Sequence, residues 1–260
     1  MKLYALVLIA TLCGCDGVFG LTHLPDIHDG GTSDGITDGA VADAPDGLFF
    51  QVANGSKIAS SASLQYSVIV PAGESQVMLV FVAAGNICTD MSAPTVQLSV
   101  PGTNPTNLGF VLGTPCQPAT SRSELWLIKS PPPGLNNVNI SLAGASARTL
   151  HSIAMVFAGV DQAMPYRAVM GASNVGMSSS VTFPSAVGDL VASFVGQGYG
   201  IAGPGAGTTL EFRQNVNTNT TLNNSAAGTL PGASPNVDAS WEFESSDEWQ
   251  AIAVSLRPAS

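Results

Sequence analysis

Short apolar runs separated by turn-forming residues constrain the fold of this chain more than any other feature of its sequence. The runs are five to nine residues long, are rich in Val, Ile, Leu and Phe, and are separated by Gly, Pro, Asn and Ser. This pattern is typical of a β-sandwich or barrel, and no segment has the period of an amphipathic helix. The sequence therefore predicts an all-β domain with strands at 48–53, 64–70, 76–84, 95–100, 108–112, 123–129, 137–142, 150–158, 178–184, 189–196, 209–214, 238–244 and 249–256.

Alternation of apolar and polar residues predicts which side chains form the core. Between 238 and 244, Ala239, Trp241 and Phe243 point one way and the polar residues point the other. One face of this strand should therefore be buried and the other wet. The run 77–83 is apolar at every position, which predicts a central strand with both faces covered.

Several short motifs resemble those of β-sandwich modules in bacterial surface proteins. Leu125-Trp126-Leu127 is followed by the turn Pro131-Pro132-Pro133-Gly134 and by the alternating segment Val138-Asn139-Ile140-Ser141-Leu142. The segments 157–162 and 249–258 also fit this pattern. The resemblance spans about 50–258 and implies a jelly-roll-like fold, in a class of modules that mostly has no assigned activity. We therefore expect a single β-sandwich domain over residues 48–260.

The first 15 residues have the parts of a bacterial lipoprotein signal. Lys2 precedes an apolar run, 3–12, which is too short to span ~30 Å of hydrocarbon as a helix. A leucine stands three positions before Cys15 and a glycine one position before it. This arrangement resembles the lipobox, in which the cysteine is acylated after cleavage. The resemblance implies removal of residues 1–14 and attachment of lipid, including palmitate-like acyl chains, at Cys15.

Two or three acyl chains hold a protein permanently on a membrane, since each buried CH₂ contributes about 0.8 kcal/mol. We therefore expect an extracytoplasmic protein anchored through its N-terminal lipid. The alternatives are an ordinary secretory signal and cleavage before Cys13, which would place Leu12 where a small residue is expected. Asp16 resembles an inner-membrane retention signal of enterobacterial lipoproteins, but that rule varies between bacteria, so inner and outer membrane both stay open.

Residues 15–47 are predicted to form a flexible tether. Seven of the 18 acidic residues lie in 16–47, which contains no Lys or Arg, and five of the seven aspartates precede glycine. Such a segment cannot bury enough apolar surface to fold, and its charges repel one another. The aspartate spacing fits neither an EF-hand nor a glycine-rich nonapeptide repeat, so no calcium site is predicted.

The remaining composition narrows the function. With eight Lys and Arg and a net charge of −10, the chain has no basic patch for nucleic acid. Cys88 and Cys116 are expected to form a disulfide in an oxidising compartment, worth about 3.5 kcal/mol. The histidines lie far from them in sequence, and no partner for His151 can be placed. We therefore expect no metal and no cofactor.

Two catalytic motifs occur by letter but lack the necessary context. The segment 31–35 spells GxSxG inside the tether, and 198–203 spells GxGxxG before the sequence 204–207, Pro-Gly-Ala-Gly, which cannot begin a helix. The second motif is expected to form a mobile hairpin loop. Glu242 and Glu244 share one strand face at roughly 6.5–7 Å, but the pattern of jelly-roll glycosidases is missing. No catalytic residue is predicted.

The candidates for ligand binding suit sugar recognition. Trp249 and Tyr199 offer rings for stacking, and Asn215, Asn217 and Asn219 offer amides for hydroxyl groups. A polar edge strand or loop is the alternative for the asparagines. We expect a non-enzymatic binding module, with polysaccharide as the favoured ligand class. A structural or protein-interaction module of the cell envelope is the alternative, and a glycan-active enzyme is the third possibility.

Overall fold

Every regular element in the computed structural model is a β-strand, over the residues that the structure describes: 47–85, 95–112, 121–143, 147–215 and 224–260. These residues belong to the compact unit Asp43–Ser260. Within these ranges no helix is long and apolar enough to cross a membrane. The predicted all-β sandwich is confirmed, and its strands are β1 (Phe49–Ser61), β2 (Ser63–Val70), β3 (Val77–Gly85), β4 (Thr95–Ser99), β5 (Thr106–Leu112), β6 (Arg122–Lys129), β7 (Gly134–Ala143), β8 (Ala147–Ala158), β9 (Tyr166–Pro184), β10 (Leu190–Gln197), β11 (Ile201–Pro204), β12 (Thr209–Gln214), β13 (Asn224–Pro231) and β14 (Asn236–Leu256).

A five-stranded antiparallel sheet has both of its faces covered. Its order is β1-β8-β3-β6-β5, so β3 lies in the middle, and all nine residues of β3 are buried. The prediction of a central strand at 77–83 is confirmed. A strand that packs on both faces needs apolar side chains at every position, which is what its sequence provides.

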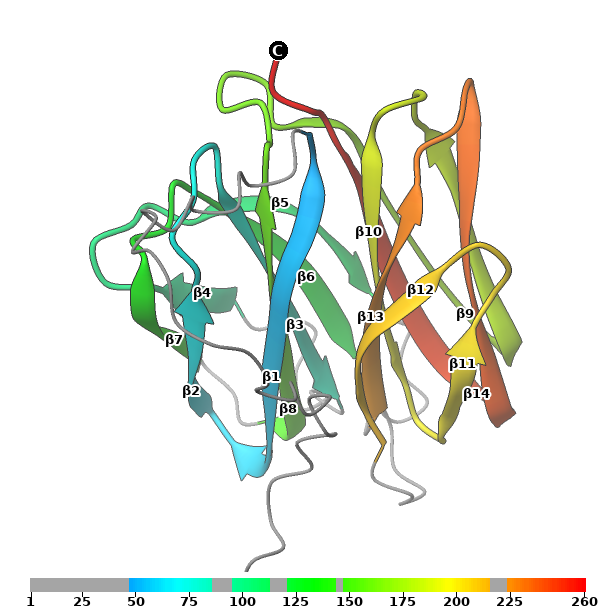
Figure 1. The fold of residues 1–260 in the computed structure, drawn as a ribbon. Helices are drawn as coiled ribbons and strands as arrows, with labels where there is room; N and C mark the ends of the chain where they lie inside the picture. The colour runs from blue at the N-terminus through cyan, green and yellow to red at the C-terminus, as the bar shows by residue number, and fades with distance from the viewer. Residues whose placement is uncertain (1–46, 86–94, 113–120, 144–146, 216–223) are drawn as a thin grey trace, which may run out of the picture. The chain divides into compact units, whose positions relative to one another are not determined.

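The first core lies between one face of this sheet and the three-stranded sheet β2-β7-β4, which Figure 1 shows beside it. Met78 and Val80 face this core from β3, while Val68 and Ile140 face it from β2 and β7. The residues of β2 that alternate with these inward side chains point away from the core. The three-stranded sheet therefore has one apolar face and one face directed away from the core.

The second core lies between the other face of the five-stranded sheet and the sheet that contains β10, β13 and β14. Phe81 of β3 stacks on Phe194 of β10, with ring centroids 5.5 Å apart and an interplanar angle of 15°. Val254 and Leu256 complete this core from the end of β14. The two sheets are thus held together by interdigitated apolar side chains.

The third core forms because the last sheet folds back on itself. Residues 249–256 of β14 pair with β10, whereas 241–243 pair with β11, and the register with β9 shifts between Glu242 and Asp247. β14 reverses its direction between Glu242 and Asp247, and we call this part of the fold the corner. The reversal brings Trp241 close to β10, where its indole nitrogen donates to Ser193 Oγ at 3.0 Å. Figure 1 shows the two arms of β14, the first in orange and the last in red. The apolar side chains that the arms enclose form the third core.

The burial predicted for 238–244 is confirmed: Ala239, Trp241 and Phe243 are at most 4% exposed, and the acidic residues that alternate with or flank them, Asp238, Glu242 and Glu244, are exposed. The separate strands predicted at 238–244 and 249–256 are instead one bent strand, β14. The hairpin loop predicted at 198–203 is also wrong, because Gly198 and Gly200 are buried at the corner and β11 follows them.

Four strand segments were not predicted: residues 54–61 of β1, the first part of β9, all of β11, and β13. β13 has the sequence Asn-Ser-Ala-Ala-Gly-Thr-Leu-Pro and is buried from Asn224 to Leu230. Its small side chains suit a strand held closely between two neighbours, β10 and β12. A Cβ atom on Gly228 would lie 2.6 Å from the carbonyl oxygen of Thr209 and 3.2 Å from Trp241 Cη2. Packing therefore outweighs the low strand propensity of this segment.

The proline-rich turn connects two sheets. Leu125, Trp126 and Leu127 lie in β6, and the turn 131–134 carries the chain to β7 of the three-stranded sheet. Gly134 has a φ of 97°, a backbone conformation that residues with a Cβ atom rarely adopt. The turn thereby brings the alternating sequence of β7 into the centre of the three-stranded sheet.

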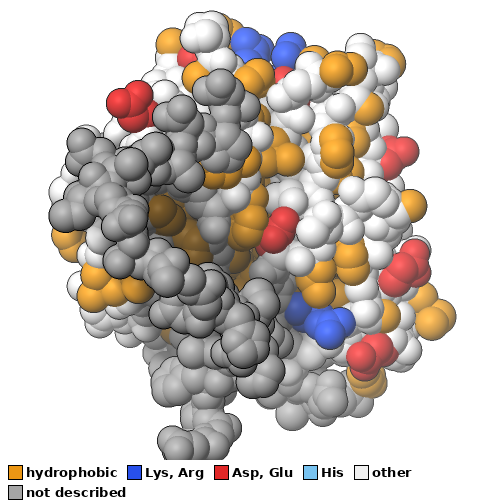
Figure 2. All heavy atoms as spheres, in the orientation of Figure 1, with side chains coloured by type: hydrophobic (Ala, Val, Ile, Leu, Met, Phe, Trp, Pro, Cys, Tyr) orange, Lys and Arg blue, Asp and Glu red, His pale blue; other side chains and the backbone are white. Residues whose placement is uncertain are grey.

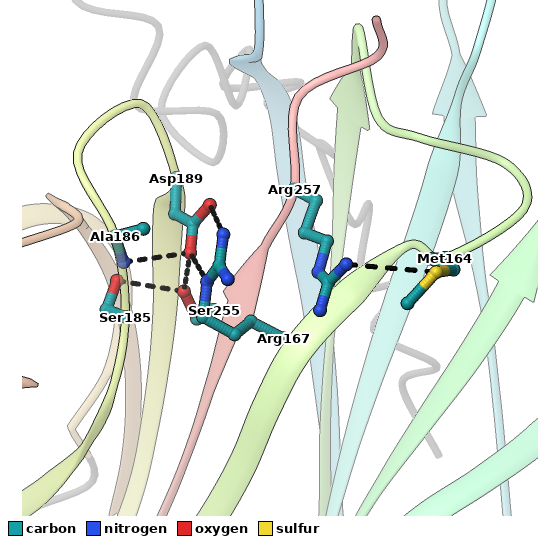
Figure 3. A network of polar contacts seen from close by, with 7 residues as sticks. All are labelled: Met164, Arg167, Ser185, Ala186, Asp189, Ser255 and Arg257. Atoms are coloured by element: carbon teal, nitrogen blue, oxygen red, sulfur yellow. Dashed lines mark hydrogen bonds and ion pairs between the residues drawn. The ribbon is translucent and has the colours of Figure 1, made fainter. Parts of the chain in front are cut away.

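At the end of the last sheet opposite the corner, a buried carboxylate links the segment before β10 to β9 and β14. Asp189, before β10, accepts hydrogen bonds from Arg167 Nε at 2.7 Å and Nη2 at 3.2 Å, from Ser255 Oγ at 2.7 Å and from the backbone N–H of Ala186 at 3.1 Å (Figure 3). Ser185 Oγ lies 2.9 Å from Ser255 Oγ. The Asp189 side chain is 1% exposed, so these bonds take the place of its hydration.

Candidate functional site

The outward face of the three-stranded sheet is lined by neutral polar side chains. Because side chains alternate along a strand, β2, β7 and β4 each present every second residue on this face. Apart from the apolar pair Ile69 and Leu135 at one end, the outward side chains are polar; we call this polar part the amide face, and its members are Ser63, Gln65, Ser67, Gln97, Ser99, Asn137, Asn139 and Ser141. A shallow hollow of about 330 Å³ opens on it, and none of the nine residues that line the hollow carries a charge.

Strand register places the polar groups of the amide face in rows. Asn139 of β7 stands opposite Gln65 of β2 on one side and opposite Ser99 of β4 on the other. Ser141 stands in the same way between Ser63 and Gln97. Directly opposed residues have Cβ atoms about 4.5–5.5 Å apart. Each row therefore presents three hydrogen-bonding groups to one ligand.

Hydrogen bonds within the amide face orient some of these side chains and leave other donors and acceptors of the same side chains unused. Ser67 Oγ donates to Asn137 Oδ1 at 2.7 Å, and Ser141 Oγ lies 3.3 Å from Gln97 Oε1. The Asn139 amide donates to two backbone carbonyls at 3.4 Å, which is long for a hydrogen bond. An amide side chain offers two N–H donors and an oxygen with two lone pairs, so these side chains can both donate to and accept from a ligand.

The residues predicted from sequence to bind a ligand lie elsewhere, near the corner. Trp249 is only 6% exposed and belongs to the third core. Tyr199 is half-buried, and its carbonyl oxygen accepts from the Asn224 amide at 2.6 Å. The Asn215 amide is used within the fold, because it accepts from Ile201 N at 3.1 Å and donates to Ile201 O at 2.9 Å.

The other predicted site residues lie outside the described part of the chain. They are Asn217 and Asn219 of the predicted ligand site, Cys15 of the lipobox, and Cys88 and Cys116 of the predicted disulfide.

The corner also gathers acidic side chains. Cβ atoms on Gly198 and Gly200 would collide with the carboxylates of Asp247 and Glu244, so glycine at both positions makes room for these groups. Glu242 and Glu244, which share a strand face in the sequence pattern, are both exposed. They stand where the register of β14 shifts, and the spacing of a regular strand therefore does not apply beyond Glu242.

Near the corner, Glu248 of β14 bonds to Ser121, the residue before β6 of the five-stranded sheet. Its carboxylate accepts from Ser121 Oγ at 2.5 Å, and Gln250 Nε2 donates to the same serine oxygen. Burial raises the pKa of Glu248, and the nearby Asp247 charge adds to this rise against the opposing hydrogen bonds from Ser121 and Gln250. His151, for which the sequence suggested no partner, is buried with Nδ1 3.5 Å from Ser225 Oγ of β13. These contacts close the end of the second core.

Charge is sparse elsewhere on the described surface. On the side of the molecule in Figure 2, the Lys, Arg, Asp and Glu side chains of the described residues do not form an extended patch of one sign. Within the same described ranges, no three His, Cys, Asp or Glu side chains are grouped so that they could hold a metal ion. The amide face differs from this surface because all eight of its side chains are polar and uncharged.

Comparisons of this chain with protein-family models, with curated proteins and with solved structures give no match.

Proposed function

We propose that this chain is a membrane-anchored extracytoplasmic lipoprotein whose β-sandwich is a non-enzymatic binding module for polysaccharide, with the amide face as its binding site. The observation that carries this proposal is the open hollow of about 330 Å³ lined by uncharged side chains. Hydroxyl and amide groups match the hydroxyl groups of a sugar, since both partners donate and accept hydrogen bonds.

The openness of the site favours a polymer over a small molecule. Sites for small ligands are concave and bury most of the ligand surface. The amide face is instead an exposed sheet surface, with Gln65, Gln97 and Ser99 all exposed to solvent. A long chain can make many weak contacts along such a surface, so moderate interactions at each sugar add up.

The first prediction tests the binding site. Replacing Gln65 and Asn139 by alanine should weaken retention of the full-length protein on its polysaccharide by about tenfold or more, since each lost hydrogen bond is worth about 1 kcal/mol. Affinity electrophoresis in gels that contain individual polysaccharides measures this effect. Asn236→Ala removes an exposed amide on another layer of the fold and should leave retention unchanged.

Tyr199→Ala distinguishes the amide face from the corner. If retention is lost with Tyr199→Ala but kept with the Gln65 and Asn139 substitutions, the ligand binds at the corner and the assignment to the amide face is wrong. If the folded full-length protein is retained by no polysaccharide, the proposed function fails and a protein-interaction module takes its place.

The second prediction tests the anchor. Cys15→Ser removes the thiol that the lipobox would acylate, so the protein should move from the membrane fraction to the soluble extracytoplasmic fraction. Two or more acyl chains account for stable membrane binding, so their loss should release nearly all of the protein from the membrane. Cys13→Ser is the matched control and should leave the protein with the membrane. Fractionation followed by mass spectrometry of the N-terminal peptide reports both location and lipid; persistence of the Cys15→Ser protein in the membrane would contradict the lipid anchor.

A further inference from the structure

We infer that the polysaccharide is uncharged and lies along β2 and β7, with its hydroxyl groups on the amide face and the apolar faces of its rings on Ile69 and Leu135. This inference rests on the proposed function and adds to it the class of sugar and the direction in which the chain lies.

The absence of charge across the amide face argues for an uncharged ligand. All eight of its side chains are Ser, Asn or Gln. Anionic groups on a ligand are usually held by Arg or Lys, whose charge offsets the loss of hydration. A uronic acid or sulfated sugar on this face would lose water from its anionic groups without gaining a cationic partner among these residues.

An exposed apolar pair extends the amide face at one end. Ile69 of β2 is 65% exposed and Leu135 of β7 is 70% exposed, and the two stand directly opposite each other in the strand register. They point to the same side as Gln65 and Asn139, because the positions differ by four, an even number, along each strand. Contact with the C–H faces of sugar rings would remove this apolar surface from water.

Strand geometry sets the direction of the chain. Ile69 stands four positions after Gln65, which corresponds to roughly 13 Å at ~3.3 Å per residue. The pair Ser67–Asn137 lies between them and continues the polar surface. Across the sheet, three strands spaced ~4.8 Å apart give only about 10 Å. A chain that contacts both the hollow and the apolar pair must therefore run along the strands.

The experiment compares neutral and anionic polysaccharides with the full-length protein. Affinity electrophoresis is run with a neutral glucan and with polygalacturonate, each at low and at high salt, on the wild type, the Ile69→Ser/Leu135→Ser variant and Val187→Ser. Val187 is 84% exposed but lies outside the three-stranded sheet, so its variant controls for the loss of exposed apolar surface. We expect retention by the neutral glucan only, little dependence on salt, and a loss of about fivefold or more in the double variant alone.

The outcomes separate this inference from the proposed function. Retention by polygalacturonate that weakens with salt would overturn the inference and leave polysaccharide binding in place. Full retention of the Ile69→Ser/Leu135→Ser variant, together with loss in the Gln65→Ala/Asn139→Ala variant, would overturn the direction assigned to the chain. Failure of the wild type to bind either polymer, or any other polysaccharide tested, would overturn the proposed function itself.

Discussion

Replacing Trp241 by alanine should lower the free energy of unfolding by about 3–5 kcal/mol, the range for removal of a buried large aromatic side chain. Trp241 is fully buried and lies in the third core. It also links the first arm of β14 to β10, which pairs with the second arm, because its indole N–H donates to Ser193 Oγ at 3.0 Å. The substitution would leave a cavity between the arms and leave the buried Ser193 hydroxyl without this donor.

Urea unfolding followed by circular dichroism measures this loss. Trp241→Phe keeps most of the apolar volume but removes the indole N–H, and it should therefore be less destabilising than alanine. Glu242→Ala changes the adjacent, exposed side chain and should stay within about 0.5 kcal/mol of the wild type. A loss below about 1 kcal/mol for Trp241→Ala would mean that the arms of β14 do not enclose a packed core.

Replacing Asp189 by alanine should cost about 2–3 kcal/mol. The substitution removes the acceptor for the guanidinium of Arg167, the hydroxyl of Ser255 and the backbone N–H of Ala186. Buried donors that lose their acceptor cost free energy, and breaking a buried ion pair costs more than an exposed one. The expected loss is smaller than for a fully buried ion pair, because the Arg167 side chain is 35% exposed and can regain water.

The cost should depend on pH. Burial raises the pKa of Asp189, but the hydrogen bonds from Arg167 and Ser255, the charge of Arg167 and the Ala186 N–H outweigh it, so the pKa is lowered from its ordinary value of 3.8. An acid with a lowered pKa in the folded state stabilises the fold fully above its unfolded value and loses this contribution as the pH falls through the folded pKa.

The difference in stability between wild type and Asp189→Ala should thus be constant above about pH 5 and narrow below about pH 4. Urea unfolding at a series of pH values measures it. Asp238→Ala, which removes an exposed carboxylate, serves as the control and should show a much smaller effect. A difference that widens on acidification would contradict the role assigned to the Asp189 carboxylate.

The sequence predicts strands well where side chains alternate or are uniformly apolar. The central position of β3 and the buried face around Trp241 follow directly from these patterns. β13 is not predicted because Ser, Ala and Gly have low strand propensity. These small residues form a strand here because the neighbouring strands lie too close for larger side chains. The sequence does predict an interruption between the strands at 238–244 and 249–256, but the reversal of β14 there, with pairing to β9 kept on both sides, depends on tertiary packing.

The candidate site was less accessible from the sequence. The aromatic rings and the asparagine-rich stretch predict a site near the corner. In the structure Trp249 is buried there, and the Asn215 amide bonds to the backbone of Ile201. The amide face does have a signal, the period-two polar residues of β2 and β7, but any solvent-facing sheet surface shows the same alternation. Register is the missing information, because Gln65, Asn139 and Ser99 are far apart in sequence and become neighbours only through pairing of three strands.

The position of β1 has a mechanical consequence for a protein that is anchored at one end and holds a polymer. The chain enters the fold at β1, which pairs with β8 from Phe49↔Ala158 to Ser61↔Ala147, and then passes directly into β2 of the amide face. Tension between the membrane and the polysaccharide would therefore act along β1 from end to end. If the proposed anchor and the proposed binding site are both correct, this load shears the ladder of backbone hydrogen bonds between β1 and β8 along its length instead of peeling the bonds one by one.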